Sequence, residues 1–288
     1  SPYFPANATY IKGWTFKLVG SGSSFGFLAI DKENEQVVLC FRGSTDYYQI
    51  VDEVLHSYGV KYPSFPGFPA PPGVTVVDYF LSAWKGISGD LEASLPQVMK
   101  DHPTYRLLIT GHSFGGAIAS LTAFGLVRRN LVDSKKVSLY TFGQPRTGNI
   151  AYANMHSKLI PDAYRVVNNR DPVPHVPICT PKADTTKQEC EFTLDSFQPW
   201  HAKTEIYYDK GEYEKGIMCT YRECVLPPMG EDHSCSDGLI DFPAEVFLPG
   251  LTIVERIKLI VDWAGDLIDQ HSEYWDVLEY GFCGIRKP

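Results

Sequence analysis

Residues 105–119 read Y-R-L-L-I-T-G-H-S-F-G-G-A-I-A, and this stretch decides the fold. The apolar run 107–109 predicts a buried strand, and the small residues from Gly116 onward predict a helix. Between them, G-H-S-F-G has the G-x-S-x-G pattern of a sharp strand-to-helix turn, where glycines leave room for a strained central residue. We therefore expect Ser113 at a helix N-terminus, with its hydroxyl exposed as a nucleophile near backbone N–H groups. The alternative is an ordinary glycine-rich turn.

The composition favours one α/β domain spanning residues 1–288. The chain is 44% hydrophobic, which is enough to bury a large core, and it has no internal repeat or Gly/Ser linker. The formal net charge of −8 argues against nucleic acid as a partner. No uninterrupted apolar stretch is long enough to span a membrane, so we expect no transmembrane segment. We also expect a monomer.

The cysteines indicate a secreted protein. Five of the seven lie between Cys179 and Cys235, a density typical of disulfide-bonded extracellular domains rather than of cytosolic proteins with incidental thiols. Asn7 begins the sequon N-A-T, which predicts a glycosylation site. Because the sequence begins with Ser1 rather than Met, we also expect a processed chain.

The cysteine-rich region could hold a zinc ion or local disulfides. Cys219 and Cys224 lie near His233 and Cys235, but no second compact pair completes a four-ligand zinc site. We therefore expect neither a metal nor another cofactor. Two disulfides are predicted: Cys179–Cys190 and Cys219–Cys235. Cys40, in the apolar segment V-V-L-C-F, is expected to be a buried free thiol.

Strand and helix patterns alternate along the chain, as in proteins with a parallel sheet. Strands are predicted at 25–30, 36–41, 105–110, 137–142, 163–168 and 204–208. Helices are predicted at 47–58, 76–99, 114–128, 149–158 and 251–268, the second with an interruption near Gly86 and Gly89. This order predicts an α/β fold with a mostly parallel central sheet and helices on both faces.

A nucleophilic serine needs a histidine base that a carboxylate orients, and in α/β-hydrolases the acid and then the histidine follow the serine. Asp171 directly follows the predicted strand 163–168, so it would lie at the carboxyl edge of the sheet. The alternative is an ordinary Asx turn before Pro172.

Four later histidines are candidates for the base: His175, His201, His233 and His271. His175 is badly placed, because it lies four residues from Asp171 on a proline-stiffened loop. His271 follows the long predicted helix on a late connection that can fold back over Ser113. The pattern favours His271 and leaves His201 and His233 open.

Several motifs together resemble the class 3 (fungal-lipase-like) lipase family. They are F-R-G-S-T, G-H-S-F-G-G-A, Y-T-F-G-Q-P-R-T-G-N, V-V-N-N-R-D-P-V-P-H-V-P and W-H-A-K-T-E-I-Y-Y. The resemblance covers about residues 25–285, and some segments look similar to nematode members. It implies an α/β-hydrolase fold. It also implies that His271 is the catalytic base, because D-Q-H-S-E-Y-W is similar to the family's histidine motif.

The same resemblance implies an oxyanion hole made by the N–H groups of Ser44, in R-G-S, and Phe114. Two donors on separate segments suit the chemistry, since they meet at the oxygen of the tetrahedral intermediate. Ser44 could otherwise be a simple turn residue.

The segment 45–73 is expected to form a lid within the domain. It begins as an amphipathic helix and continues into a Pro/Phe/Tyr-rich loop able to line an acyl-chain groove. The residues expected to contact lipid are Tyr47, Tyr48, Ile50, Val51, Val54, Phe65 and Phe68. The alternative is that this helix packs permanently in the core.

We therefore expect a secreted serine hydrolase that cleaves carboxylic ester bonds of lipids at a lipid–water interface, as a triacylglycerol lipase does. A phospholipase A1, a mono- or diacylglycerol lipase and a feruloyl-type esterase are alternatives on the same fold. A non-catalytic lipid-binding protein is the alternative from another class, and the presence of every triad residue argues against it.

Overall fold

The computed structural model describes residues 14–21, 24–44, 59–179, 190, 198–209, 221–225, 230–238 and 250–252, and then 255, 258, 259, 262, 271 and 274. Side chains are described from residue 26 onward. Several residues named above lie outside this set, and their expected roles stay predictions: Asn7, Tyr47, Tyr48, Ile50, Val51, Val54 and Cys219.

Among the described residues, eight strands form a central sheet in which the middle strands run parallel. In spatial order they are β1 (Trp14–Ser21), β2 (Ser24–Asp31), β3 (Gln36–Phe41), β6 (Arg106–His112), β7 (Val137–Phe142), β9 (Ala163–Asn168), β11 (Glu205–Tyr208) and β12 (Arg222–Cys224). The strands from β3 to β11 are parallel, whereas β1 and β2 at one edge and β12 at the other pair antiparallel. The prediction of a mostly parallel central sheet is confirmed.

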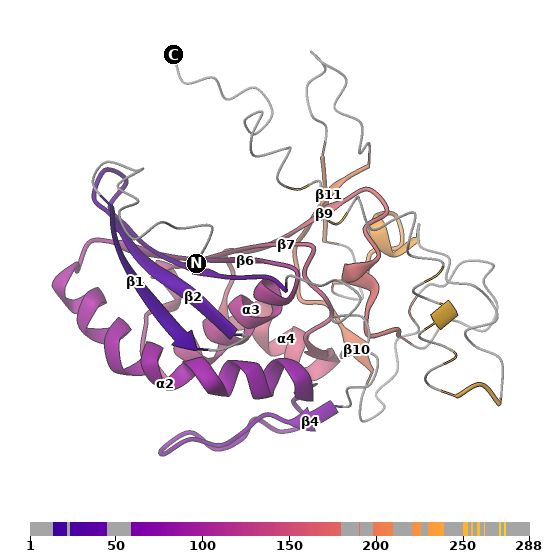
Figure 1. Ribbon diagram of the computed structural model, residues 1–288, viewed down its shortest axis with the longest axis horizontal. Coiled ribbons are helices and arrows are strands. Elements are labelled where there is room, and N and C mark those ends of the chain that lie inside the picture. Colours follow the sequence, from indigo (N-terminus) through magenta and orange to yellow (C-terminus); the bar gives the residue numbers. More distant parts are fainter. Residues whose placement is uncertain are drawn as a thin grey trace, which may run out of the picture.

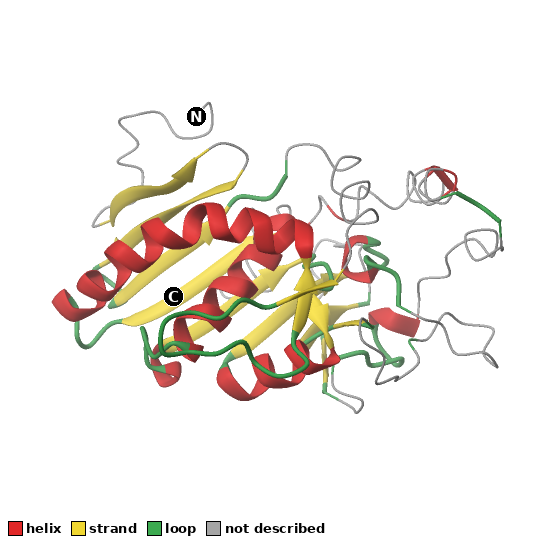
Figure 2. Cartoon of the chain, turned by 90° about the horizontal axis from the view of Figure 1, so that it is seen from below, coloured by secondary structure: helices red, strands yellow, loops and turns green. Residues whose placement is uncertain are grey.

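The described long helices all lie on one face of this sheet (Figures 1 and 2). They are α2 (Asp78–Asp101), α3 (Phe114–Arg128) and α4 (Ile150–Leu159). The strand order explains this, because β3, β6, β7 and β9 advance in one direction and right-handed crossovers then place each connecting helix on the same side. We expected helices on both faces; within the described part of the chain they cover one. Short 3₁₀ helices occupy Ser134–Lys136, Val173–His175 and Ser236–Gly238.

The α2–α3 contact explains the sequences of both helices. α3 is buried over residues 114–127, and a side-chain carbon at Gly125 would lie 2.9 Å from Trp84 Cζ2, so small residues let the helices approach. α2 runs without the expected interruption through Gly86 and Gly89, because both glycines face open space while apolar residues between and around them are buried.

A second, small sheet shapes the loop that carries Phe65 and Phe68. Its strands, in spatial order, are β10 (Pro199–Trp200), β8 (Gly148–Asn149), β5 (Thr75–Val77) and β4 (Gly59–Lys61). Phe65 exchanges two backbone hydrogen bonds with Phe68, stacks edge-on against Trp84 and lies under the Arg129 guanidinium. Arg129 follows the end of α3, about 24 Å along the helix from Ser113. The expectation that Phe65 and Phe68 line a groove at the nucleophile is therefore wrong, because the aromatic core draws this loop to the far end of α3.

The structure contains the predicted disulfide Cys179–Cys190, but Cys235 bonds to Cys224 rather than to Cys219. The pairing of β12 with β11 brings Cys224 to within 6.4 Å of Cys235, measured between Cα atoms, which explains the correction. Of the cysteines that the structure describes, Cys40 is the free thiol, as predicted, although its side chain is partly rather than fully buried.

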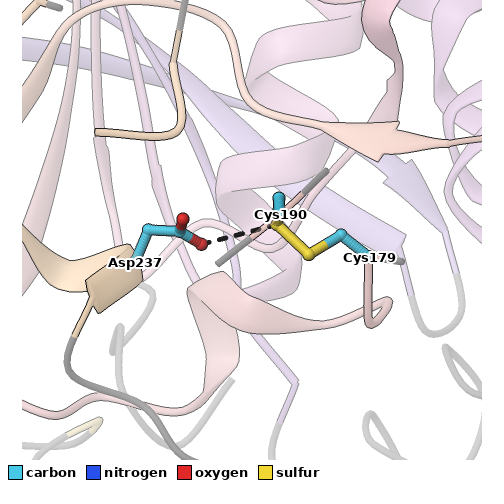
Figure 3. A group of neighbouring side chains, drawn as sticks. All are labelled: Cys179, Cys190 and Asp237. Carbon is cyan, nitrogen blue, oxygen red and sulfur yellow. Dashed lines mark hydrogen bonds between the residues drawn. A yellow bond between two sulfur atoms is a disulfide. The ribbon is translucent and has the colours of Figure 1, made fainter. Parts of the chain in front are cut away.

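The sulfur of Cys190 lies 3.4 Å from Asp237 Oδ1, a grouping that could suggest a metal site (Figure 3). Cys190 and Cys179 are bonded to each other, however, and metal ligation requires a thiolate. The group is therefore a disulfide packed against a buried acid.

Candidate active site

Ser113 lies on a strained turn between β6 and α3, as the G-x-S-x-G pattern predicts. Its φ is +57°, a conformation that L-residues rarely adopt. A side-chain carbon at Gly111 would lie 2.3 Å from Gly115 O, and one at Gly115 would lie 2.4 Å from Phe41 O. Both glycines are therefore required by close backbone approach. Ser113 is only 2% exposed, less than the pattern predicts, because the loop at Gly43 packs beside it.

Asp171 and His271 come together although 100 residues separate them. His271 Nδ1 lies 3.0 Å from Asp171 Oδ1 and 2.9 Å from Oδ2, and both side chains are buried. Because a carboxylate only accepts hydrogen bonds, Nδ1 carries the proton and Nε2 is left to act as the base. Asp171 lies just after β9, at the carboxyl edge of the sheet, where the sequence led us to expect it.

Three groups keep Asp171 ionised in its buried position. Burial is the largest single effect and by itself would raise the pKa of this carboxyl, but the His271 imidazole, its hydrogen bond and two further donors together outweigh it. The Tyr274 hydroxyl donates to Oδ2 at 2.6 Å, and the Val173 N–H donates to Oδ1 at 2.9 Å. Together they hold the pKa of Asp171 below its usual value.

His271 lies beside the Ser113 turn, in a space that Gly143 leaves open. Its ring packs against that of His112, the residue before Ser113, with centroids 4.4 Å apart and the planes tilted by 30°. Gly143, which follows β7, gives the ring its space, because a side-chain carbon there would lie 2.8 Å from both His271 Cε1 and Asp171 Oδ2. The elbow, the acid and the histidine therefore occupy one site.

The segments that carry the two expected oxyanion donors both lie next to Ser113. Phe114 is the first residue of α3, so its N–H belongs to the unpaired first turn of the helix. The loop with Ser44 runs against the turn, since a side-chain carbon at Gly43 would lie 2.9 Å from His112 O and 3.5 Å from Ser113 Cβ. Both segments therefore lie next to Ser113, and their role as an oxyanion hole stays a prediction.

The other candidate histidines contact groups away from Ser113. His201 Nε2 donates to Pro174 O at 2.7 Å, and His233 Nδ1 lies 2.5 Å from Asp237 Oδ2. Burial, with a smaller effect of Arg146, lowers the pKa of His175 to about 3 and keeps it neutral. These residues belong to the packing around the cysteine-rich region.

The sequence reasoning missed Arg146, which shapes the loop after Asp171. Arg146 is buried and pairs with Glu231 at 2.8 Å and Asp237 at 3.2 Å. Its Nη1 also donates to the carbonyls of His175 and Pro177, so it holds the end of the loop that follows Asp171. The sequence feature that could have revealed its role is an arginine between two glycines in the segment G-Q-P-R-T-G-N.

Comparison with known proteins identifies the family. Residues 38–180 match the family model described as lipase (class 3). The chain belongs to this family. A lipase of Caenorhabditis elegans is 30% identical over 226 residues, which cover 74% of this chain and 59% of that protein; this confirms the expected likeness to nematode members. The lipase of Rhizomucor miehei is 32% identical over 168 residues, 58% of this chain and 44% of that protein.

Solved lipases share the fold. The lipase of Rhizopus microsporus var. chinensis superposes with a TM-score of 0.64 at 23% identity, covering 86% of this chain and 74% of that chain. The Rhizomucor miehei lipase in its propeptide complex gives 0.61 at 27% identity, with 84% and 67% covered. The predicted α/β-hydrolase fold is confirmed. The chain spans about half the length of the curated relatives it matches.

Proposed function

We propose that this protein is a secreted serine hydrolase that cleaves carboxylic ester bonds of lipids. One observation carries the proposal: His271 Nδ1 donates to the buried Asp171 carboxylate at 2.9 Å, beside the strained Ser113 turn. An imidazole held in this tautomer is the base that a serine nucleophile requires.

In the proposed reaction, Ser113 attacks the ester carbonyl while His271 accepts the hydroxyl proton and passes it to the leaving alcohol. Asp171 stabilises the imidazolium that forms in between. The N–H groups of Ser44 and Phe114 bind the negative oxygen of the tetrahedral intermediate. Water then attacks the acyl-enzyme with the same histidine as base and releases the fatty acid.

The relatives support acylglycerols as the substrate class. Secreted relatives from Fusarium solani and Penicillium cyclopium are mono- and diacylglycerol lipases, and a solved relative is a triacylglycerol lipase whose catalytic centre is a serine protease triad. We infer triacylglycerol-lipase-like activity, and partial glycerides are the second candidate because two of these relatives act on them. The substrate panel described below also tests phospholipase A1 and feruloyl esterase activity.

The setting of the reaction is also part of the proposal. The disulfides Cys179–Cys190 and Cys224–Cys235 support an oxidising, extracellular compartment. Within the described residues, no helix combines the length and apolar character needed to cross a bilayer. We propose a monomer. The amphipathic pattern of residues 47–58 supports contact with the substrate at a lipid surface, with this segment as a lid.

A fluorophosphonate probe tests the nucleophile, because it reacts with a serine activated by a base. We expect labelling of the wild-type protein at Ser113, located by mass spectrometry, and its loss in Ser113→Ala and His271→Ala. The matched control is His102→Ala, since His102 stacks on Tyr105 before the start of β6 and touches none of the site. Labelling of folded His271→Ala at the wild-type rate would refute the assignment of the base.

A substrate panel tests the chemistry. Tri-, di- and monoacylglycerols, a phospholipid and a feruloyl ester are compared at equal ester concentration, above and below the solubility limit of each lipid. We expect the highest kcat/KM on an acylglycerol. A preference for the feruloyl ester or the phospholipid would overturn the inferred substrate class.

A further inference from the structure

His112 makes two contacts with the proposed base that the reaction scheme above does not use. It is the last residue of β6, and since Gly111 packs toward α3, the alternation along a strand directs His112 to the opposite face of the sheet. Its Nε2 lies 2.8 Å from the backbone oxygen of His271. Its ring packs against the His271 ring, with centroids 4.4 Å apart and the planes tilted by 30°.

The chemistry of the first contact fixes the tautomer of His112. A backbone carbonyl only accepts hydrogen bonds, so Nε2 must carry a proton. Burial, with a smaller effect of the neighbouring His271, lowers the pKa of His112 to about 3. His112 is therefore a neutral imidazole with its single proton on Nε2, and it adds no positive charge beside the imidazolium that His271 forms during the reaction.

We propose that His112 is a positioning residue for the base: its Nε2–H anchors the main chain of His271, and its ring face holds the imidazole against Asp171. The proposal rests on the proposed function of His271. A base that reaches its acid across 100 residues needs both its backbone and its ring fixed, because reacting groups tolerate little misplacement. The Tyr274 ring completes the cluster, with its centroid 5.3 Å from that of His112 and 6.2 Å from that of His271.

Three substitutions separate the two contacts. His112→Gln keeps an N–H donor near the Nε2 position and removes the ring; His112→Phe keeps the ring and removes the donor; His112→Ala removes both. We expect His112→Ala to lower kcat on the order of 10- to 100-fold with little change in KM. Gln and Phe should each recover part of this loss. His102→Ala is the matched control and should leave kcat unchanged.

The pH profile distinguishes positioning from a purely structural role. Without the His112 ring, water reaches the His271 imidazole and its charged form loses less solvation, so the acidic limb of kcat/KM should move to higher pH. All rates are divided by the number of sites titrated with fluorophosphonate, which removes the contribution of unfolded molecules. If Ala does not fold, Gln and Phe provide the same measurement, because both fill the site.

The proposal is overturned if the folded variants show wild-type kcat per titrated site and an unmoved acidic limb. It is also overturned if Gln and Phe lose as much activity as Ala. A failure of the proposed function looks different, since the wild-type protein itself would then neither react with the probe nor hydrolyse any ester in the panel.

Discussion

Gly143→Ala perturbs the Asp171–His271 pair without removing either side chain. A Cβ at position 143 would lie 2.8 Å from Asp171 Oδ2, 2.8 Å from His271 Cε1 and 2.9 Å from His271 Nδ1. Moving these atoms from 2.8 Å to an ordinary contact distance of 3.4 Å requires a shift of about 0.6 Å. A misplacement of 1 Å can cost about 100-fold in rate, so we expect kcat to fall roughly 10- to 100-fold while KM changes little.

Alanine substitutions at two further glycines separate the backbone cost of the change from its contact with Asp171 and His271. Gly143 has a φ of +54°, which costs alanine about 1–2 kcal/mol in the folded state. Gly67 has a φ of +77° with nothing within 4 Å, so Gly67→Ala carries the backbone cost alone. Gly86, inside α2, faces open space without a positive φ, so Gly86→Ala should stabilise the protein by about 1 kcal/mol.

The assay combines turnover of a soluble short-chain ester with urea unfolding of each variant. Gly67→Ala should lose stability and keep its kcat, whereas Gly143→Ala should lose both. A folded Gly143→Ala protein with the kcat of Gly67→Ala would refute the reasoning, because the contact with His271 and Asp171 would then have no bearing on the reaction.

Three further results are expected. Tyr274→Phe removes the 2.6 Å hydrogen bond to Asp171, which is worth about 1.5–3 kcal/mol. The value of kcat/KM should therefore fall on the order of 10- to 100-fold, and the acidic limb of its pH profile should move to higher pH. An unmoved pH profile would contradict this. His112, His156 and His175 have pKa values lowered by burial to about 3, below the ordinary 6.5, so the unfolded chain takes up protons first as the pH drops. Stability should therefore fall between about pH 6.5 and pH 3, by up to about 1.4 kcal/mol per pH unit for each histidine. Urea unfolding at pH 7, 6 and 5 checks this, and a constant free energy of unfolding would be inconsistent with neutral histidines. The double substitution of Cys179 and Cys190 by Ser opens an 11-residue loop and should cost about 2–3 kcal/mol of stability, and the same change at Cys224 and Cys235 should cost as much. Only the first disulfide contacts Arg146, so only its removal should also lower kcat.

The elements that the sequence predicts well are those with long apolar patterns. The predicted bounds 36–41, 137–142, 163–168 and 114–128 agree with β3, β7, β9 and α3, because buried parallel strands and a buried helix leave continuous apolar runs. The small sheet was missed because its strands are two or three residues long, too short for any alternation to appear.

The residues of the candidate site also differ in how well the sequence predicts them. Ser113 and Asp171 follow directly from local patterns, a G-x-S-x-G turn and an acid after a strand. Tyr274 could also have been found, because it lies three residues after His271 and such residues share one face of a helix. Gly143 could not have been found from the sequence, because the need for a glycine there arises from His271, 128 positions later in the chain.

Arg146 shows why the support of an acid is harder to infer than the acid itself. Charged residues are usually exposed, so a sequence gives no reason to bury this arginine. Burial becomes favourable only when Glu231 and Asp237, 85 and 91 residues later, supply two carboxylates within 3.2 Å. The same guanidinium holds the carbonyls of His175 and Pro177, and so the loop that begins at Asp171. The geometry of the acid therefore depends on the late cysteine-rich region, where regular patterns are weakest and where the predicted pairing of Cys235 failed.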